Sequence, residues 1–317
     1  MKKTILITGG SGFLGKRLGK TLLRDYDVIL GSRNNKQNYL ASSFSGCKTV
    51  PLDVTKIESV RDALNELKPH IIIHAAATKF VDLAEKQPME CIDVNVLGSQ
   101  NIVRVAIEKN VEIVIGISTD KATPPVRNTY GLSKALMERL FCSMDEKTDT
   151  KCCCVRYGNV AWSTGSVLPI WKKMFDTTGI IGTTGPEMRR FIFTVEEAVN
   201  LVIVALNNIK EVHGKVLSRA MKAAQIQEIL DVWTKYKGGK WERIEGRPGE
   251  RNDEYLIGEL ELPFTEEKYY NNIRHFLIAF NKKSNNPPTE ILSSANAERL
   301  TENEIEEIIN NPPIEEL

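Results

Sequence analysis

Tyr130 and Lys134 lie four residues apart, and this spacing has the most direct chemical meaning in the chain. Residues i and i+4 share one face of a helix, so the Lys134 ammonium is expected beside the Tyr130 phenol. A nearby positive charge lowers the pKa of a tyrosine from about 10 toward neutrality. Such a tyrosine removes the proton of an alcohol while hydride leaves the same carbon. The pair therefore predicts an alcohol-oxidising site.

A second acid/base pair, Asp120 and Lys121, lies upstream, directly after Ser118 and Thr119. A dehydrogenase needs only one base, so a further pair indicates that another step follows the oxidation. Two simpler roles are open, because Asp120 can cap the turn that follows and Lys121 can be a solvated surface charge. The position between an expected buried strand and the Tyr130 helix favours the chemical role.

These residues need a scaffold, and strand and helix patterns alternate through the first half of the chain. The expected strands are apolar runs at Thr4–Thr8, Asp27–Gly31, Thr49–Leu52, Ile71–Ala76, Ile113–Ser118 and Cys152–Tyr157. The expected helices are Lys16–Arg24, Ser59–Leu67, Met89–Lys109 and Thr129–Met144. Such alternation is typical of a parallel sheet covered on both faces. The predicted fold class is α/β, a doubly wound parallel sheet of the Rossmann type with a smaller C-terminal mixed α/β lobe.

The regular alternation ends near residue 160, which suggests three parts. Residues 1–160 are predicted to form the cofactor-binding domain. Residues 161–282 are predicted to form the substrate-binding lobe, with loops over 161–188 that close over a ligand and a sheet-docked helix at Thr194–Asn208. Residues 283–317 are predicted to form a tail that contains a short helix.

Composition excludes several classes of protein. The 317-residue chain has a formal net charge of +1, so no nucleic-acid partner is predicted. No apolar run has the length of a signal peptide or a membrane span, so a cytoplasmic enzyme with no membrane partner is expected. The six cysteines lack zinc-ligand spacing and predict no metal site. The cysteine triplet 152–154 is expected to be buried in a strand rather than to do metal or redox chemistry.

A glycine-rich segment follows the first expected strand and opens the first expected helix. Its glycines permit a tight turn, close approach of the backbone to a pyrophosphate, and close packing of helix on strand. The free N–H groups of the helix N-terminus would face the phosphates. A purely structural glycine turn is the alternative, and the strand–turn–helix context favours the cofactor role. The residues assigned to this site are Thr8, Gly9, Ser11, Gly12, Phe13, Leu14 and Gly15.

The end of the second expected strand bears on the choice of nicotinamide cofactor. NAD-binding folds place an acidic residue there for the ribose 2′-hydroxyl, whereas this chain has Ser32 and Arg33. Arg33 suits a 2′-phosphate, so NADP is favoured over NAD; stacking of Arg33 on the adenine would leave the choice open. Asp53 is assigned to the adenine edge, although it can equally cap the next helix. The other cofactor contacts assigned from strand ends are Val54, Ala75, Ala76, Ala77 and Ser118.

The glycine loop, the alanine turn at 75–77, Asn95 and the Tyr130/Lys134 pair together resemble an extended short-chain dehydrogenase/reductase. That superfamily acts mostly on nucleotide sugars, and the resemblance places Asn95 in the cofactor site. Within it, residues 118–122 (Ser-Thr-Asp-Lys-Ala) resemble the inverting UDP-N-acetylglucosamine 4,6-dehydratases of polysaccharide biosynthesis. The similarity covers nearly the whole chain.

The resemblance implies a redox-neutral lyase reaction on a UDP-sugar. Tyr130, supported by Lys134, would take the C4 hydroxyl proton during oxidation, with Thr119 orienting the oxygen; Lys134 would also hold the nicotinamide ribose. Neutral Lys121 would remove the C5 proton of the 4-ketone, and protonated Asp120 would protonate the departing C6 hydroxyl. Return of hydride to C6 and protonation of C5 from the opposite face would give the L-arabino 4-keto-6-deoxy sugar.

Matches to the family also assign the substrate side of the site. An arginine fork suits a diphosphate, and a carboxylate suits the diol of a ribose. Two assignments have open alternatives, because Lys79 can be a surface lysine and Asn159 can bond a buried carbonyl. The residues expected to contact the nucleotide sugar are Lys79, Asn159, Ser166, Val167, Arg190, Arg247 and Glu250.

Two other functions compete with this interpretation. A nucleotide-sugar 4-epimerase or 4-ketoreductase needs only Thr119, Tyr130 and Lys134 and leaves the Asp-Lys pair without a role. A non-catalytic NADP-binding protein is expected to lose some acid/base groups, and this chain retains all of them. By analogy with the superfamily a homo-oligomer is expected, with helices Met89–Lys109 and Thr129–Met144 at its seam.

Overall fold

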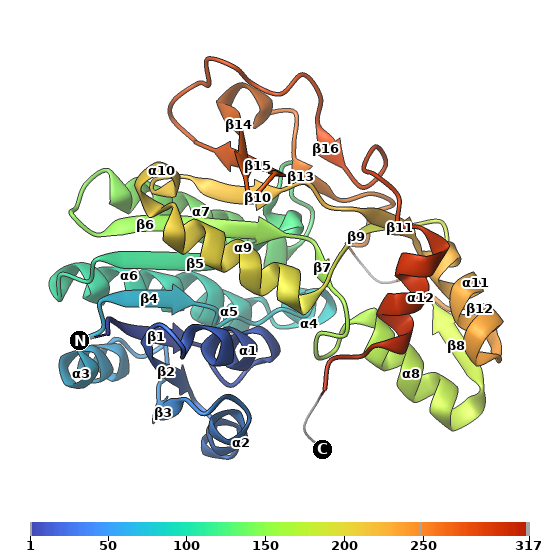
Figure 1. The fold of residues 1–317 in the computed structure, drawn as a ribbon, viewed down its shortest axis with the longest axis horizontal. Helices are drawn as coiled ribbons and strands as arrows, with labels where there is room; N and C mark the ends of the chain where they lie inside the picture. Colours follow the sequence, from blue (N-terminus) through green and yellow to red (C-terminus); the bar gives the residue numbers. More distant parts are fainter. Residues whose placement is uncertain (1, 247–248, 315–317) are drawn as a thin grey trace.

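A computed structural model describes residues 2–246 and 249–314. Its centre is a nine-stranded sheet, drawn across the middle of Figure 1. Seven neighbouring strands run parallel, and two antiparallel strands complete one edge. In spatial order the strands are β3 (Lys48–Pro51), β2 (Asp27–Ser32), β1 (Thr4–Thr8), β4 (Ile71–His74), β5 (Ile113–Thr119), β6 (Lys151–Tyr157), β10 (Val216–Arg219), β15 (Ile273–Ile278) and β14 (Thr265–Tyr270). The prediction of a doubly wound, mostly parallel sheet is confirmed.

Helices cover both faces of the sheet, because strand side chains alternate between faces and here both sets are apolar. Ile5 and Ile7 of β1 pack in a core beneath α1 and α9, and Leu6 between them packs on the other face with side chains of α3, α6 and α7. These runs therefore have no polar alternation, as expected for buried parallel strands. The helices are α1 (Phe13–Leu22), α2 (Asn35–Ser45), α3 (Ile57–Leu67), α6 (Gly98–Glu108), α7 (Thr129–Asp145) and α9 (Val195–Asn207).

A smaller part of the molecule lies beside the carboxyl ends of the strands, at the right of Figure 1. Its core is built around Trp162, Trp171 and Trp233, whose rings pack together. Its elements are β7 (Asn159–Val160), α8 (Val167–Thr178), β8 (Ile180–Thr183), β9 (Arg189–Phe193), β11 (Ala223–Gln225), α11 (Ile226–Lys237), β12 (Lys240–Arg243) and α12 (Glu302–Asn310). Short connecting elements are α4 (Val81–Lys86), α10 (Ile209–Val212), β13 (Tyr255–Ile257), the 3-10 turn η3 (Leu262–Phe264) and β16 (Leu292–Ser293).

Two features of this C-terminal part differ from the sequence expectation. The segment 161–188, expected as loops, contains helix α8 and strand β8. Pro169 is compatible with this helix because it lies in the first turn of α8, where a helix needs no N–H donor. The strands β14 and β15, expected in the smaller lobe, extend the central sheet instead. The division of the chain into three parts stays a prediction.

In place of the single long α-helix expected over Met89–Lys109, the structure has three consecutive helical elements without a break between them. It begins as α5 (Pro88–Ile92), widens into a π-helical turn, η1 (Asp93–Leu97), and continues as α6. Asn95 lies in the wide turn and is fully buried. Such turns are frequent at functional sites because they redirect a side chain.

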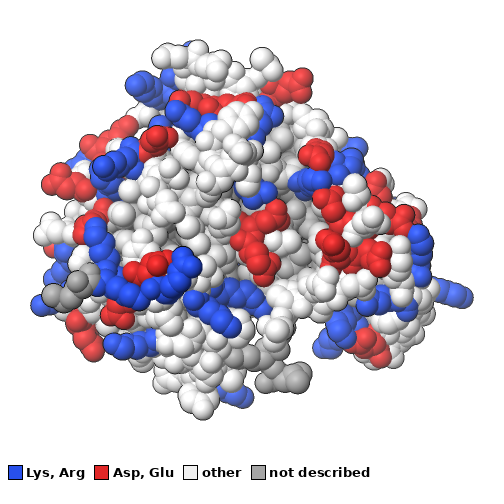
Figure 2. All heavy atoms as spheres, viewed as in Figure 1, with Lys and Arg blue, Asp and Glu red and all other residues white. Residues whose placement is uncertain are grey.

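The surface carries charges of both signs. On the face drawn in Figure 2, acidic and basic side chains are interspersed over most of the outline. No helix in the described part of the chain has both the length and the apolar content that crossing a bilayer requires. The cysteine triplet 152–154 is fully buried in β6, as expected, and burial raises the pKa of each of its thiols.

Candidate functional site

A cleft of about 820 Å³ runs between the carboxyl ends of the central strands and the smaller part of the molecule. Its first end is lined by the glycine loop, and its second end by residues of β8, β9 and α11. In open α/β sheets, ligands bind outside the carboxyl ends of the strands. The cleft is where the structure brings together most of the residues singled out from the sequence.

The glycine loop has the shape that a pyrophosphate requires. Gly9 has φ +67°, and a Cβ there would lie 2.6 Å from the Ala76 backbone nitrogen. A Cβ on Gly15 would lie 2.7 Å from the Gly10 Cα. The helix and the loop therefore pack too closely for any side chain at position 15. Gly12 caps α1 without a side-chain hydrogen bond, and the first turn carries no acidic residue. The open N-terminus of α1 therefore suits an anion.

The end of β2 lines the cleft with Ser32 and an exposed Arg33. The Ser32 hydroxyl accepts from Ser11 at 2.7 Å and donates to Asn38 at 2.5 Å. Val54 lines the cleft, but Asp53 does not. Asp53 Oδ1 accepts from the backbone and hydroxyl of Thr55, at 3.1 and 2.8 Å, and so holds the turn that precedes α3. The N-cap position of α3 is Lys56, so Asp53 does not cap that helix.

Two other residues assigned to the cofactor lie behind the cleft wall. Thr8 is fully buried, and its hydroxyl pairs with His74 Nδ1 at 2.7 Å. Asn95 exchanges two hydrogen bonds with the Thr78 backbone, at 2.8 and 2.9 Å, and donates to Ser133 at 2.9 Å. Both therefore hold the loops that line the cleft rather than line it themselves. The cleft wall does include Phe13, Leu14, Ala75, Ala76, Ala77 and Ser118.

Tyr130 and Lys134 lie together on α7 and both line the cleft. Asn128 starts this helix by accepting from the Gly131 backbone at 2.7 Å. The Lys134 ammonium donates to the Ile117 carbonyl at 2.8 Å, and burial lowers its pKa to about 8. Burial, reinforced by Asp120, raises the pKa of Tyr130. The expected lowering of the Tyr130 pKa is therefore not seen: burial raises that pKa, and the group that opposes the rise is the hydroxyl of Thr119, through a hydrogen bond, rather than Lys134.

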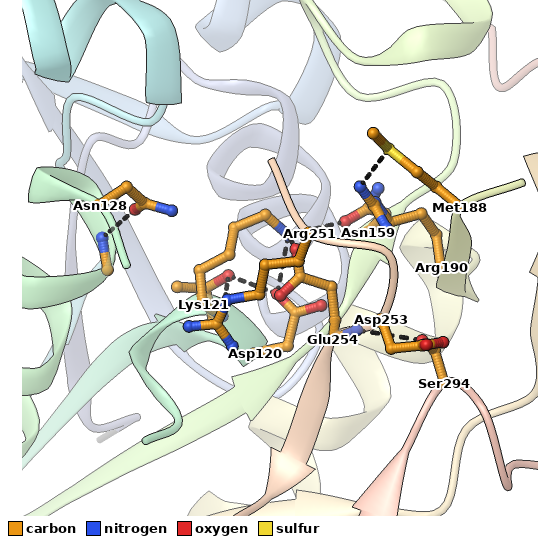
Figure 3. Close-up of polar contacts among 12 residues, drawn as sticks. Asp120, Lys121, Asn128, Asn159, Met188, Arg190, Arg251, Asp253, Glu254 and Ser294 are labelled. Carbon is orange, nitrogen blue, oxygen red and sulfur yellow. Dashed lines mark hydrogen bonds and ion pairs between the residues drawn. The ribbon is translucent and has the colours of Figure 1, made fainter. Parts of the chain in front are cut away.

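Asp120 and Lys121 begin a 3-10 turn, η2 (Asp120–Ala122), directly after β5 (Figure 3). Asp120 is fully buried, and its Oδ1 accepts from Thr119 Oγ1 and from Lys121 Nζ, both at 2.9 Å. Lys121 Nζ also donates to Asn159 Oδ1 at 3.0 Å. Lys121 and Thr119 line the cleft, whereas Asp120 lies beneath them. Lys121 is therefore held in place by polar groups and is not a solvated surface charge.

The second end of the cleft holds most residues assigned to the substrate. Arg190 donates to the carbonyls of Arg189 and Asn252, and Glu250 accepts from Thr184 at 3.1 Å. Lys79, Asn159, Ser166, Val167, Arg190 and Glu250 all line the cleft. Arg247 lies outside the described residues. The described residues contain no cluster of His, Cys, Asp or Glu arranged to hold a metal ion.

Sequence reasoning missed a carboxylate in this site. Glu254 lines the cleft with a side chain only 6% exposed, and its Oε1 lies 3.8 Å from Lys121 Nζ. It follows the Arg247–Glu250 loop closely in sequence, but no local pattern marks it. Asn128 was missed as well, although an asparagine just before a helix is a recognisable cap signal.

A family model described as polysaccharide biosynthesis protein matches residues 5–274. The chain belongs to this family. A UDP-N-acetylglucosamine 4,6-dehydratase (inverting) of Campylobacter jejuni is 35% identical over 85% of this chain and 82% of its own. A UDP-glucose 4-epimerase of Rickettsia felis is 31% identical over 98% of this chain and 96% of its own. The chain is thus an enzyme of the nucleotide-sugar dehydratase and epimerase superfamily.

Solved structures agree on the fold. The crystal structure of Pen from Bacillus thuringiensis has a TM-score of 0.89 and 27% identity and covers 98% of both chains. TunA, described as an NAD-dependent NDP-hexosamine 5,6-dehydratase, has a TM-score of 0.68 and 21% identity over 79% of this chain and 87% of its own. The second likeness supports only the extended short-chain dehydrogenase/reductase fold.

Proposed function

We propose that this enzyme is an inverting 4,6-dehydratase of UDP-N-acetylglucosamine that uses NADP. The observation that carries the proposal is the position of Lys121 in the cleft wall, held by Asp120 and Asn159 next to the Tyr130 helix. An oxidoreductase that acted only at C4 would not need this second base. The C. jejuni relative with the matching printed activity supports the same reaction.

The first half-reaction is assigned to the α7 residues. The glycine loop and the Ser32–Arg33 strand end would hold the nicotinamide cofactor, which would supply the capacity to take up hydride from C4 and to return it to C6. Tyr130 takes the C4 hydroxyl proton, and Thr119 orients that hydroxyl. Because burial raises the pKa of free Tyr130, the phenolate must gain its stabilisation when positive charge is brought beside it. We assign Lys134, which is buried on the same helix, to supply part of that charge once the ligands are bound.

The second half-reaction is assigned to the η2 residues. Lys121 removes the C5 proton, which the new ketone has made acidic. Asp120 supplies the proton that leaves with the C6 hydroxyl as water. Its route to the cleft runs through Thr119, whose hydroxyl bonds Asp120 Oδ1 and whose side chain lines the cleft. Protonation of C5 from the opposite face completes the inversion.

The two ends of the cleft support the ligand assignments. Arg33 and Ser32, with no carboxylate beside them at the end of β2, favour a ribose 2′-phosphate and hence NADP. Arg190 and Glu250 at the second end suit the diphosphate and ribose of UDP.

A 4-epimerase is the second candidate, because the R. felis relative carries that name across almost the entire chain. Such an enzyme would use Thr119, Tyr130 and Lys134 in the same way. It would leave the buried Asp120–Lys121 arrangement without a chemical role.

The test is incubation of the purified protein with UDP-N-acetylglucosamine in deuterated water, followed by proton NMR of the sugar. The proposal expects a 4-keto-6-deoxy product of L-arabino configuration with deuterium at C5. Epimerisation at C4 without deuterium uptake would establish the second candidate instead. A product with an exocyclic C5–C6 double bond would keep the elimination but contradict the return of hydride to C6.

A further inference from the structure

Glu254 is held in the cleft wall through its backbone. Its backbone N–H donates to Ser294 Oγ at 3.0 Å, and its carbonyl accepts from the Ser294 N–H at 2.8 Å. Asp253 beside it pairs with Arg189 through two hydrogen bonds of 2.7 Å, which anchor the segment to β9. The side chain of Glu254 points away from these anchors toward Lys121 (Figure 3). Its position is therefore set by the fold.

One oxygen of this carboxylate lacks a hydrogen-bond partner among the described residues. That oxygen is Oε2, which is buried. A buried carboxylate oxygen without a partner is costly, so such groups call for an explanation. Burial raises the pKa of Glu254, and Asp120 adds to this effect, while Lys121, Arg190 and Arg251 oppose it. Glu254 is thus a carboxyl group that can hold a proton inside the site.

This inference rests on the proposed function, which does not say where the Lys121 ammonium sends the proton that it must lose before it can act as a base. Lys121 must be neutral to remove the C5 proton. Asp120 carries the proton intended for the C6 hydroxyl, so it cannot also accept one from Lys121. Asn159, the other close partner of Lys121, offers an amide oxygen that is not a base. Of the described carboxylates, Glu254 is the other one within 4 Å of the Lys121 ammonium.

We propose that Glu254 is the proton acceptor that makes Lys121 a base. The proton leaves Nζ for Oε1: an N–H bond breaks, an O–H bond forms, and the nitrogen keeps its electron pair. Lys121 then uses that pair to take the C5 proton of the 4-ketone. The 3.8 Å separation is bridged by one water or by a swing of the ammonium away from Asn159. Glu254 acts through Lys121 and is a positioning residue.

The decisive variant is Glu254→Gln, which keeps the shape of the side chain and removes its basicity. Holoenzyme in deuterated water with UDP-N-acetylglucosamine is followed for C5 deuterium and, separately, for absorbance of reduced nicotinamide. We expect C5 exchange to fall about 100-fold, the low end of acid–base contributions. Reduction of the nicotinamide, which depends on Tyr130, should change by less than about threefold.

The pH profile gives a readout that a structural role would not move. In the natural protein Glu254 and Lys121 together hold one proton in the active form, so C5 exchange falls as the pH drops and the second proton binds. In Glu254→Gln, Lys121 must lose its proton to solvent. The acidic limb of C5 exchange is therefore expected at higher pH in the variant.

Two matched variants serve as controls. Glu254→Asp keeps a carboxylate and should restore part of the C5 exchange. Glu259→Gln changes an exposed glutamate nearby and should behave as the natural protein. The unfolding midpoint of Glu254→Gln should not fall, because an amide costs less to bury than a carboxylate.

The outcomes separate the two proposals. Natural protein that exchanges C5, with Glu254→Gln exchanging equally fast, would overturn the role of Glu254 and keep the dehydratase. Equal loss of nicotinamide reduction and C5 exchange in Glu254→Gln would also overturn it, since that pattern reports damage to binding. Natural protein that epimerises C4 without C5 exchange would overturn both.

Discussion

The two sides of the cleft are built in different ways. On the cofactor side, the functional residues lie within a few positions of a strand end: the glycine loop follows β1, and Ser118 is the last residue but one of β5. On the substrate side, Arg190 and Glu254 come from separate segments that are joined by side-chain contacts, such as the Arg189–Asp253 pair. The first side is positioned by local structure and the second by tertiary contacts.

This difference suggests where changes will act. Lys121 lies where the two sides meet. It is in the turn η2, directly after β5 on the cofactor side, and it contacts Asn159 and Glu254 of the substrate side. A change there should separate the oxidation from the elimination. Changes in tertiary contacts should loosen the substrate side, and changes in strand-end residues should affect the cofactor alone.

Lys121→Met is expected to have the largest effect. It removes the C5 base but keeps much of the length of the side chain, so formation of product should fall about 10²–10⁴-fold. Nicotinamide reduction at C4 should persist, because Tyr130 and Lys134 are unchanged. Product is measured by NMR and the half-reaction by absorbance.

The matched variant is Tyr130→Phe, which should lose both the reduction and the product. If Lys121→Met abolished both signals to the same degree, Lys121 would take part in the oxidation step, and its assignment to the elimination alone would be wrong.

Arg156→Met should have the next largest effect, on stability. The Arg156 guanidinium is fully buried, binds Glu138 of α7 and Glu261 near η3, and donates to the Leu256 carbonyl at 2.9 Å. Removing it leaves two buried carboxylates without their cation, a loss of about 3–5 kcal/mol in the free energy of unfolding. Denaturant titration measures it.

An exposed ion pair provides the comparison for Arg156. Arg243→Met breaks the surface pair with Glu187, and such pairs contribute about 0–1 kcal/mol. Equal losses in the two variants would show that the buried cluster does not hold the segment around β13 to the sheet.

The same contrast explains what could be predicted from the sequence. The central sheet and the cofactor loop were predictable, because apolar strands, a glycine turn and Tyr130–Lys134 spacing are local patterns. The strands β14 and β15 were expected in the smaller lobe but extend the central sheet, since β15 pairs with β10, which lies far back along the chain. Glu254 was missed for the same reason: its role depends on Lys121, and no spacing in the sequence connects the two.

Burial also reversed one electrostatic expectation. Helical spacing placed Tyr130 and Lys134 together on α7 and in the cleft wall, but spacing carries no information about desolvation. In the folded protein the lysine ammonium bonds the Ile117 carbonyl, and burial raises rather than lowers the pKa of the tyrosine.

Arg33→Ala tests the cofactor side with a smaller expected effect. If Arg33 binds a ribose 2′-phosphate, loss of a charge-assisted contact of about 1.5–3 kcal/mol weakens NADP binding about tenfold or more. Binding of NAD, which lacks that phosphate, should change little. Titration calorimetry with each cofactor measures the difference, and equal weakening of both would favour stacking on the adenine.

Asp53→Ala should have the smallest effect and separates a structural turn from cofactor binding. Asp53 Oδ1 accepts two hydrogen bonds from Thr55 and lies outside the cleft wall. Loss of these turn hydrogen bonds should lower the free energy of unfolding by about 1 kcal/mol, with NADP affinity unchanged. Val54, the next residue, does line the cleft, so Val54→Ala is the matched change that should weaken the cofactor instead. A drop in NADP affinity for Asp53→Ala without loss of stability would mean that this carboxylate turns toward the adenine when the cofactor binds.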